Sequence, residues 1–385
     1  MRKKVQRLAL SVAVASMALS PLAQACTALL YNDKQGNSYV GRTLELPMEL
    51  PYYLAYSPVG TSFGSEADHH HPLTFTAKYD FVSIGLPDFS VKDLKVIDGI
   101  NDQGLAFSLL AFPATKGPID SANKTQAVLA AIDLGAWSLA QFATVAEVKK
   151  ALETQPTQVT ELLPFDVLDT PFHYILHDAT GASIVIEYAD GQQNVYDNPI
   201  GVMTNGPEFP WHLKNLDNYT FLNNKDVSTS SFRGQHFSQP DTGIATVALP
   251  ASNTAVGRFV RATYYSQYAE QAKTPTEAVT TLAHVMNNFD RPRGITMDSR
   301  FDSGAANAVA PEVVGHPGYI SEYTTWTSLR DLKQKHYYVR TYKNGMHYSK
   351  IDLSQLKGGA SSAIKLSDAA EANELDITSQ LNVGE

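Results

Sequence analysis

The pattern of apolar and polar positions predicts strands in antiparallel pairs, with helices grouped between them. Apolar or alternating runs bounded by turn residues predict strands over residues 26–32, 38–45, 96–100, 104–110, 172–177, 182–188, 194–196, 324–329, 335–342 and 347–352. Apolar positions at helical spacing predict helices over residues 124–140, 144–152, 256–271 and 275–288. Because strands and helices do not alternate strictly, the pattern favours an α+β fold built in layers over a parallel sheet.

Two stretches lack such a pattern. Residues 46–93 are rich in Pro, Tyr, Gly and His, so we expect long loops over a cleft. Residues 358–385 are small, polar and acidic, and form either a docking arm or a disordered tail. The chain between the first strand and this tail is long enough for one large domain or two smaller ones.

The first two predicted strands form a hairpin that brings charged residues back to Cys26. Turn residues occupy positions 33–37, and a turn centred there places Cys26 opposite about residue 44. Arg42 and Glu45 therefore return to the beginning of the first strand. They have opposite parity along a regular strand, so a bulge or a strand end is needed for both to face the thiol. The sequence predicts their proximity but not their orientation.

Residues 1–25 have the pattern of an export signal. A short cationic segment is followed by an apolar run over residues 8–19, which is too short to span a membrane. Ala23 and Ala25 are small residues of the kind that signal peptidase accepts. We therefore expect removal of residues 1–25, which leaves Cys26 as the first residue of a periplasmic or secreted protein.

Composition narrows the range of partners. Four of the 30 basic residues lie in the predicted signal, so 26 remain against 39 acidic residues. This excess of negative charge argues against nucleic acid or an anionic membrane surface as a partner. Nothing after Leu19 is apolar for long enough to span a bilayer, so we expect no membrane contact once the signal is removed.

Cys26 is the only cysteine, so the chain can form no internal disulfide. In an exported protein such a cysteine is buried, paired between chains or used chemically, and its place directly after the predicted cleavage site favours use. A thiol titrates at about pH 8.5 and an α-amine at about pH 8, so the amine of the same residue can take the thiol proton. Attack on an amide carbonyl then gives an acyl-enzyme, and the ammonium can protonate the leaving nitrogen.

Four further polar residues are candidates for the same site. Arg42, if near the thiol, favours the thiolate, and Glu45 can hold the amine while raising its pKa. Asn205 lies at a strand-to-turn junction that suits a hydrogen-bond donor to the oxyanion, although asparagine is also an ordinary turn residue. Arg258 lies on a predicted amphipathic helix, where an exposed arginine is the usual expectation.

Several motifs follow one another in a recognisable order and spacing. They are Cys26-Thr27, Gly41 to Glu45, Asn101 to Leu105, His173-Tyr174, Asp178 to Glu187, Ile200 to Pro207 and Arg258 to Arg261. Together they resemble the penicillin V acylase and bile salt (choloylglycine) hydrolase family of N-terminal-nucleophile hydrolases, from Cys26 to about Asp352. The resemblance implies a single domain over residues 26–357 with a four-layer αββα fold of two packed antiparallel sheets. It also implies no cofactor, no metal and a homotetramer.

The resemblance assigns roles residue by residue. Four side chains match the family's active site, with Cys26 as the nucleophile, Arg42 as the arginine beside the thiol, Asn205 as the oxyanion asparagine and Arg258 as the second arginine. Ala111 matches the position whose backbone N–H completes the oxyanion hole. Glu45 falls where the family usually has aspartate, a change that keeps the charge and lengthens its reach by one methylene.

The family acts on small-molecule amides with an apolar or aromatic acyl group, such as phenoxyacetyl penicillins, conjugated bile acids or N-acyl homoserine lactones. A signal peptide resembles the Gram-negative branch, for which cleavage of penicillin V and acyl lactones is expected. We therefore expect an exported amidase of this kind. Bile salt hydrolysis is the alternative.

A lipoprotein is a different interpretation of Cys26. In bacterial lipoproteins the cysteine after the cut is acylated and anchors the protein to the membrane. The leucine that normally stands three residues before that cysteine is here Ala23, and Leu22 lies one place too early. Acylation blocks the amine, so a lipid-anchored, non-catalytic binding protein and the hydrolase exclude each other.

Three other patterns suggest different chemistry. Gly60 to Gly64, with Ser62 in the middle, matches a nucleophile elbow, but residues 65–72 make a poor helix, which that motif requires next. The His69–His71 run favours a solvated loop over a metal site, because adjacent histidines do not easily converge on one ion. His173 or His177 has the spacing for a Cys–His pair, although both lie in a predicted strand.

Overall fold

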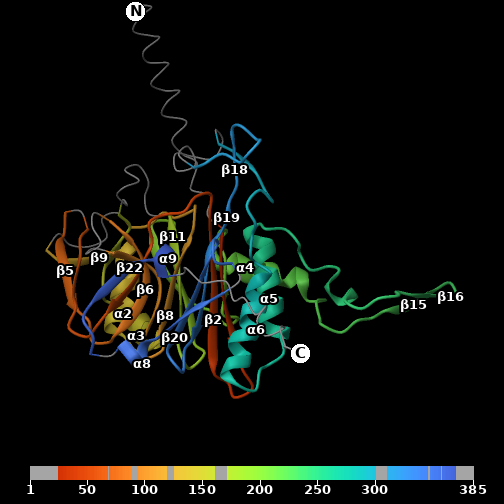
Figure 1. Cartoon of the computed structure of the whole chain (residues 1–385), viewed down its shortest axis with the longest axis horizontal. Helices are drawn as coiled ribbons and strands as arrows, with labels where there is room; N and C mark the ends of the chain where they lie inside the picture. The colour runs from red at the N-terminus through yellow and green to blue at the C-terminus, as the bar shows by residue number, and fades with distance from the viewer. Residues whose placement is uncertain are drawn as a thin grey trace, which may run out of the picture.

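Two large antiparallel sheets lie face to face, and helices cover the outer side of each (Figure 1). This computed structural model describes residues 25–67, 69–88, 94–118, 125–160, 171–300, 310–345, 347–356 and 358–369. Strands β1 and β2 of one sheet contact β8 of the other. The layers therefore run helix, sheet, sheet, helix, which confirms the predicted α+β, αββα architecture.

The first sheet carries the N-terminal hairpin near its centre. Its strand order is β14 (Val202–Met203), β1 (Ala25–Asn32), β2 (Ser38–Leu46), β19 (Tyr323–Asp331), β20 (His336–Thr341) and β21 (Ser349–Asp352). Helices α5 (Ala255–Tyr268) and α6 (Pro275–Asn287) cover its outer face. A Cβ at Gly41 would lie 2.5 Å from Met286 Sδ, so glycine lets β2 pack tightly on α6.

The second sheet supplies the opposite wall of the interior. Its order is β13 (Gln192–Asp197), β12 (Ser183–Ala189), β11 (Phe172–His177), β8 (Ala106–Ala111), β7 (Leu94–Asn101), β6 (Phe81–Pro87), β3 (Tyr53–Ser57) and β22 (Ser362–Lys365). Helices α2 (Leu134–Gln141) and α3 (Val145–Leu152) pack on its outer face. Most residues of β11 and β12 are fully buried, as a strand covered on both faces requires.

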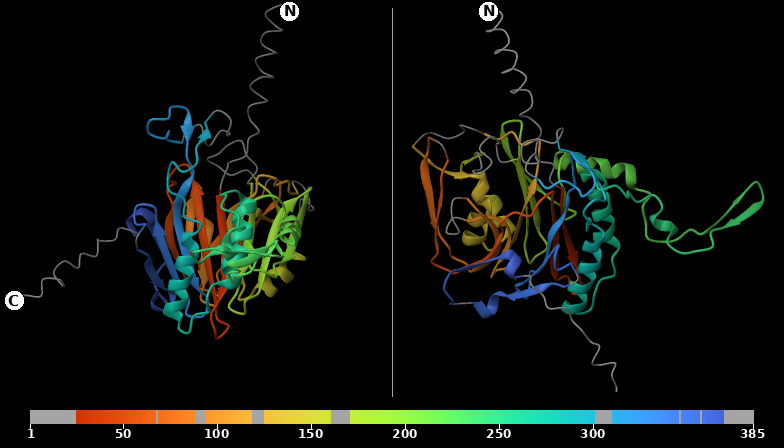
Figure 2. Two further views of the ribbon diagram at one scale, coloured as in Figure 1. Left: turned by 90° about the vertical axis from the view of Figure 1, so that its right-hand side faces the viewer. Right: turned by 45° about the horizontal axis from the view of Figure 1, so that its top comes forward.

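Shorter elements lie around these layers. They are β4 (Ser62–Ser65), β5 (His71–Thr76), β9 (Ala127–Ala130), β10 (Thr157–Gln158), β15 (Thr229–Phe232), β16 (Gln235–Ser238), β17 (Asp298–Ser299), β18 (Tyr319–Ile320), α4 (Phe209–Asn215), α8 (Leu353–Leu356), α9 (Leu366–Ala369) and the 3-10 turns η1 (Ala131–Asp133), η2 (Leu216–Tyr219) and η3 (Ile244–Thr246). The β15–β16 hairpin projects away from the body (Figure 2). No helix among the described residues is both long and apolar enough to cross a bilayer.

The prediction of long loops over residues 46–93 is wrong. The described part of this segment contains four strands, β3 to β6, of which β3 and β6 belong to the second large sheet. Proline and glycine occur at the ends of these strands, as at Pro58 and Gly60, and they hid the strands between them. Ser62 lies in β4, which pairs with β5 and leads into no helix, so the argument from the sequence against a nucleophile elbow is confirmed.

The predicted helix over residues 124–140 is only half right. Residues 127–130 form strand β9, which pairs in parallel with β5 and β10, and the helix α2 begins at Leu134. Residue 124 lies outside the described part. A short buried apolar run fits a strand as well as a helix, and here the neighbouring strands decided the outcome.

The beginning of the acidic tail docks on the body. Residues 362–365 form β22, which extends the second sheet by pairing with β3, and Leu366 in α9 is buried. Of the two alternatives left open by the sequence, docking therefore applies to residues 362–369. Residues 370–385 lie outside the described part, as do residues 1–24 of the predicted signal.

Candidate active site

Cys26 is the second residue of β1 and pairs with Leu44 of β2, which confirms the register that the turn length predicts. Its side chain belongs to the interior and is 1% exposed. Ala25 is attached to it and pairs with Glu45. In this form of the chain the Cys26 nitrogen is a peptide N–H, so the thiol is in place while the neighbouring nitrogen has no basic lone pair.

Two groups approach the sulfur from the interior. Arg42 Nη2 lies 3.8 Å from Cys26 Sγ and donates a hydrogen bond to the Leu109 carbonyl oxygen on β8 at 2.8 Å. The Ala111 N–H, at the end of the same strand, faces the sulfur and lowers the pKa of the thiol. The Arg42 guanidinium also stacks over the Trp326 ring, 4.2 Å from its centroid. A cation and a backbone donor therefore point at the atom that must become negative.

The surroundings of the Cys26 thiol act on its pKa in opposite directions. Burial raises the pKa of the Cys26 thiol above its ordinary value, and the Glu45 carboxylate raises it further. Arg42, the Ala111 N–H and Arg258 act in the other direction. Desolvation prevails, so in this buried form the thiol is held protonated while the groups that favour a thiolate are already in place.

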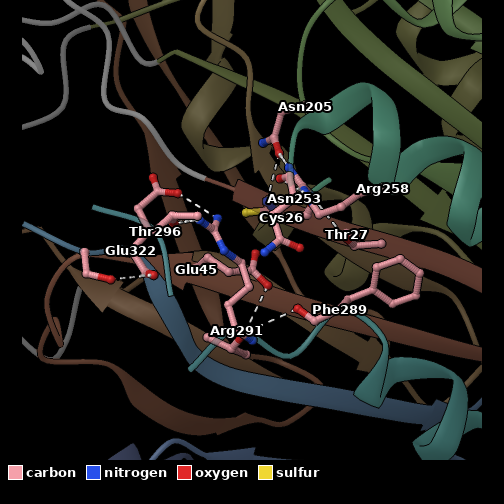
Figure 3. Close-up of polar contacts among 12 residues, drawn as sticks. Cys26, Thr27, Glu45, Asn205, Asn253, Arg258, Phe289, Arg291, Thr296 and Glu322 are labelled. Atoms are coloured by element: carbon pink, nitrogen blue, oxygen red, sulfur yellow. Dashed lines mark hydrogen bonds and ion pairs between the residues drawn. The ribbon is translucent and has the colours of Figure 1, made fainter. Parts of the chain in front are cut away.

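Asn205 contacts Cys26 (Figure 3) and also the end of β8. Its Oδ1 accepts from the Cys26 N–H at 2.8 Å and from Arg258 Nη2 at 2.7 Å, and its Nδ2 donates to the Ala111 carbonyl oxygen at 2.8 Å. Arg258 Nη1 donates to Thr27 Oγ1 at 2.8 Å and to the Cys26 carbonyl oxygen. Arg258 is 1% exposed, so it is not the exposed arginine that an amphipathic helix usually carries.

Glu45 lies on the other side of the sheet from Arg42. Arg42 contacts β8 of the second sheet, whereas Glu45 faces Arg258 of the helical layer and accepts from Thr324 Oγ1 at 3.3 Å. The opposite parity is therefore kept, and the only irregular register nearby is in β19 opposite. Burial raises the pKa of the Glu45 carboxyl group, and Arg258 opposes this most, followed by the Thr43 hydroxyl and Arg291.

Comparison with known proteins connects this geometry to a family. A family model described as linear amide C–N hydrolases, choloylglycine hydrolase family, matches residues 26–363. The chain belongs to the choloylglycine hydrolase family. The match begins at Cys26, the residue around which the site is built, and it includes every one of the six predicted site residues.

The relatives of this chain include both bile acid hydrolases and a penicillin V acylase. A conjugated bile acid hydrolase from Lactobacillus acidophilus is 28% identical over 84% of this chain and 96% of its own length. A penicillin V acylase from Pectobacterium atrosepticum is 27% identical over 68% of this chain and 65% of its own length. The family membership and these relatives make the chain an amide hydrolase.

Solved structures agree with this fold. A variant of the conjugated bile acid hydrolase from Clostridium perfringens has a TM-score of 0.74 at 25% identity and covers 91% of this chain and 100% of its own. The penicillin V acylase from Agrobacterium tumefaciens has a TM-score of 0.68 at 25% identity, covering 89% and 92%. The four layers are thus those of the N-terminal-nucleophile hydrolases of this family.

Sequence reasoning missed an ion pair behind Glu45 (Figure 3). Arg291 Nη1 donates to Glu322 Oε2 at 2.9 Å, and the Arg291 N–H donates to Thr324 Oγ1 at 2.8 Å, which in turn donates to Glu45. Burial raises the pKa of Glu322 to about 7, against the opposing effect of Arg291. Both residues lie outside regular spacing patterns, so no periodic signal pointed to them.

The other candidate residues of the sequence do not form a second site. His173 Nε2 contacts the Thr204 carbonyl oxygen at 2.9 Å and Nδ1 contacts Glu187 at 3.1 Å, so neither ring nitrogen serves Cys26 as a base. His177 Nε2 contacts the Gly201 carbonyl oxygen at 3.1 Å. In the part of the chain that the structure describes, no three His, Cys, Asp or Glu side chains are grouped to hold a metal ion.

Stability is expected to depend on pH through His177. Burial lowers its pKa from 6.5 to about 4, and among the charges that face it Arg330 lowers the value while Asp178 raises it. Between these values the unfolded chain binds a proton that the folded chain does not, so the free energy of unfolding falls as the pH falls. From pH 7 to pH 5 this one group should remove about 2 kcal/mol.

A difference measurement isolates this contribution. Glu322 acts in the opposite direction, since its raised pKa makes the folded chain bind more protons than the unfolded chain between pH 7 and 4.5. Urea unfolding of the wild type and of His177→Gln at both pH values cancels such shared contributions. From pH 7 to pH 5, the free energy of unfolding of His177→Gln should fall by about 2 kcal/mol less than that of the wild type. The control variant His284→Gln, at an exposed position, should show the same fall as the wild type. An equal loss in all three proteins contradicts the prediction.

Proposed function

We propose that the chain is an exported enzyme that hydrolyses an N-acyl amide through an acyl-enzyme on Cys26, after removal of residues 1–25. The observation that carries the proposal is the setting of the only cysteine, with Arg42 Nη2 at 3.8 Å and the Ala111 N–H on its sulfur. Export and a periplasmic or secreted location rest on the signal pattern of the sequence.

Each step follows from groups at the site. The freed α-amine takes the thiol proton, and the sulfur attacks the amide carbonyl carbon to give a tetrahedral oxyanion. We assign the Ala111 N–H and the Asn205 Nδ2, once released from the Ala111 carbonyl oxygen, as the donors to this oxyanion. The C–N bond then breaks, the leaving nitrogen takes the proton from the ammonium, and water hydrolyses the thioester.

The amine is held between charges of both signs. Glu45 favours the ammonium, and the positive charges of Arg258, Arg291 and Arg42, which surround Glu45, oppose it by repulsion. The arrangement keeps the amine close to the balance at which it can both accept and return a proton. Glu45 therefore takes the role of the aspartate that the family usually has there.

For the substrate we propose an amide of the penicillin V type, including N-acyl homoserine lactones, with conjugated bile acids as the alternative. The penicillin V acylases of Pectobacterium atrosepticum and Agrobacterium tumefaciens support the first, and the bile acid hydrolases support the second. Turnover should be measured side by side on penicillin V, glycocholate and acyl lactones of several lengths. We expect the highest kcat/KM on penicillin V or on an acyl lactone. If kcat/KM is highest on glycocholate, the bile salt hydrolase is the correct alternative. If none of these substrates is turned over, the proposed amidase activity is rejected.

We also propose that copies of the chain assemble into a homotetramer. The projecting β15–β16 hairpin (Figure 2) and its flanks carry five large apolar side chains that are each more than half exposed, namely Phe221, Val227, Phe232, Phe237 and Val247. Light scattering after gel filtration should give four times the mass of the mature chain. The double change Phe232→Ser and Phe237→Ser should lower that mass, and a monomeric wild type contradicts the proposal.

A further inference from the structure

Two buried side chains of the second sheet hold both ends of the turn that carries Asn205. His173 on β11 contacts the Thr204 carbonyl oxygen through Nε2 at 2.9 Å. Glu187 on the neighbouring strand β12 accepts from the Phe209 N–H with both oxygens, at 3.0 and 3.1 Å. The two side chains contact each other at 3.1 Å and are both 0% exposed. One connected pair therefore fixes the chain on each side of Asn205.

The hydrogen-bond roles leave a single proton between these side chains. The Thr204 carbonyl oxygen can only accept, so His173 Nε2 carries a hydrogen, and the Phe209 N–H can only donate, so Glu187 must accept there. The contact between Nδ1 and the carboxylate then contains one proton, on either partner. In both arrangements the pair has no net charge, and the hydrogen bonds to Thr204 and Phe209 are both kept in the water-free interior.

The same imidazole packs against the residue that follows the second candidate donor of the oxyanion hole. The His173 ring stacks on Phe112, with centroids 5.0 Å apart and planes within 4°. Phe112 follows Ala111 directly, whose N–H points at the Cys26 sulfur. His173 therefore lies between the strand end that carries one donor and the turn that carries the other.

A third contact completes the support of the turn. His212 Nε2 donates to the Asn205 carbonyl oxygen at 2.8 Å, and its ring stacks on Phe259 with centroids 4.4 Å apart. Phe259 is next to Arg258, which donates to Asn205 Oδ1. The Asn205 backbone is thus tied to the helical layer, while the two ends of its turn are tied to the second sheet.

We propose that His173 and Glu187 are positioning residues that set the separation between the Asn205 amide and the Ala111 N–H. The inference rests on the proposed function, because the two donors matter only if an oxyanion forms between them. Loosening the pair should weaken an interaction made in the transition state and leave substrate binding nearly unchanged. Variants that lose the contact between His173 and Glu187 should therefore have a lower kcat and a nearly constant KM.

Three variants test the pair. Glu187→Ala and His173→Ala should each lower kcat by about 10- to 100-fold, a part of what loss of an oxyanion donor costs. Glu187→Gln should stay within about threefold of the wild type, because its carbonyl oxygen can accept from Phe209 and its NH₂ can donate to Nδ1 of a neutral His173. A Gln variant as impaired as the Ala variant contradicts the proposed hydrogen-bond roles.

His177→Ala is the matched structural control. His177 lies on the same strand, is 1% exposed and also donates to a backbone carbonyl, that of Gly201, but it does not touch the Asn205 turn. It should lower Tm about as much as His173→Ala while leaving kcat within about twofold. Equal losses of kcat in the two variants assign His173 a merely structural role.

A double-mutant cycle separates failure of this inference from failure of the proposed function. In an Asn205→Ala background, His173→Ala should lower kcat by less than about twofold further, because the group that it positions is gone. If His173→Ala lowers kcat by the same factor with and without Asn205→Ala, the positioning role is overturned, while the proposed amidase activity is unaffected. If the wild type hydrolyses none of the acyl amides, the function itself fails, whatever the variants do.

Discussion

Replacing Cys26 by serine should lower amide hydrolysis by about 10³-fold or more while the fold is kept. A serine hydroxyl is far less acidic than a thiol, and the α-amine is too weak a base to deprotonate it at neutral pH. The change should be tolerated structurally, because the oxygen can still accept from the Ala111 N–H and lies in a site that is already closed. kcat/KM on the best acyl amide and Tm should be measured together.

Ser62→Ala is the control for this experiment. Ser62 lies exposed in β4 and was the nucleophile of the rejected elbow motif, so its loss should change neither kcat/KM nor Tm noticeably. The sharpest contrary result is a Cys26→Ser protein with the turnover of the wild type, since no other described residue combines a thiol with a base. A variant that unfolds leaves Cys26→Ala as the second test of the same point.

The hairpin shows where sequence reasoning is strong. A turn of fixed length determines which residues pair, so the partner of Cys26 at residue 44 was predictable from the spacing of the turn residues. Local context made Asn205 and Arg258 candidates, and the family resemblance then assigned these distant residues to the site of Cys26. No physical rule links those positions to Cys26 along the chain, because their approach depends on how β14 and α5 pack against β1.

Prediction failed where tertiary contacts overrode local signals. Residues 127–130 became a strand because β5 and β10 offered hydrogen bonds to a short apolar run, and β3 and β6 were hidden by the turn residues at their ends. The pair of Arg291 and Glu322 was missed for another reason. A buried ion pair between a loop and a strand end leaves no periodic trace, although it is linked to Glu45 through Thr324.

The second large effect concerns the nitrogen of Cys26. A chain that keeps Ala25 should hydrolyse amides about 10²- to 10⁴-fold more slowly than one that begins at Cys26, the usual contribution of a general base. With Ala25 attached, the nitrogen is an amide that donates to Asn205 Oδ1 and cannot accept the thiol proton. Two chains that differ by this one residue, with their N-termini verified by intact mass, provide the comparison.

The intact mass of the protein recovered after export of the full-length chain decides between the two interpretations of the exported cysteine. A bare Cys26 terminus supports the hydrolase, whereas a diacylated terminus removes the base and supports the lipid-anchored binding protein. Both chains should have similar Tm, because Ala25 adds only one strand pair, opposite Glu45. If the chain with Ala25 turns over substrate at the full rate, the thiol proton goes to another group, and the buried carboxylate of Glu45, whose pKa burial raises, is the first to test by Glu45→Gln.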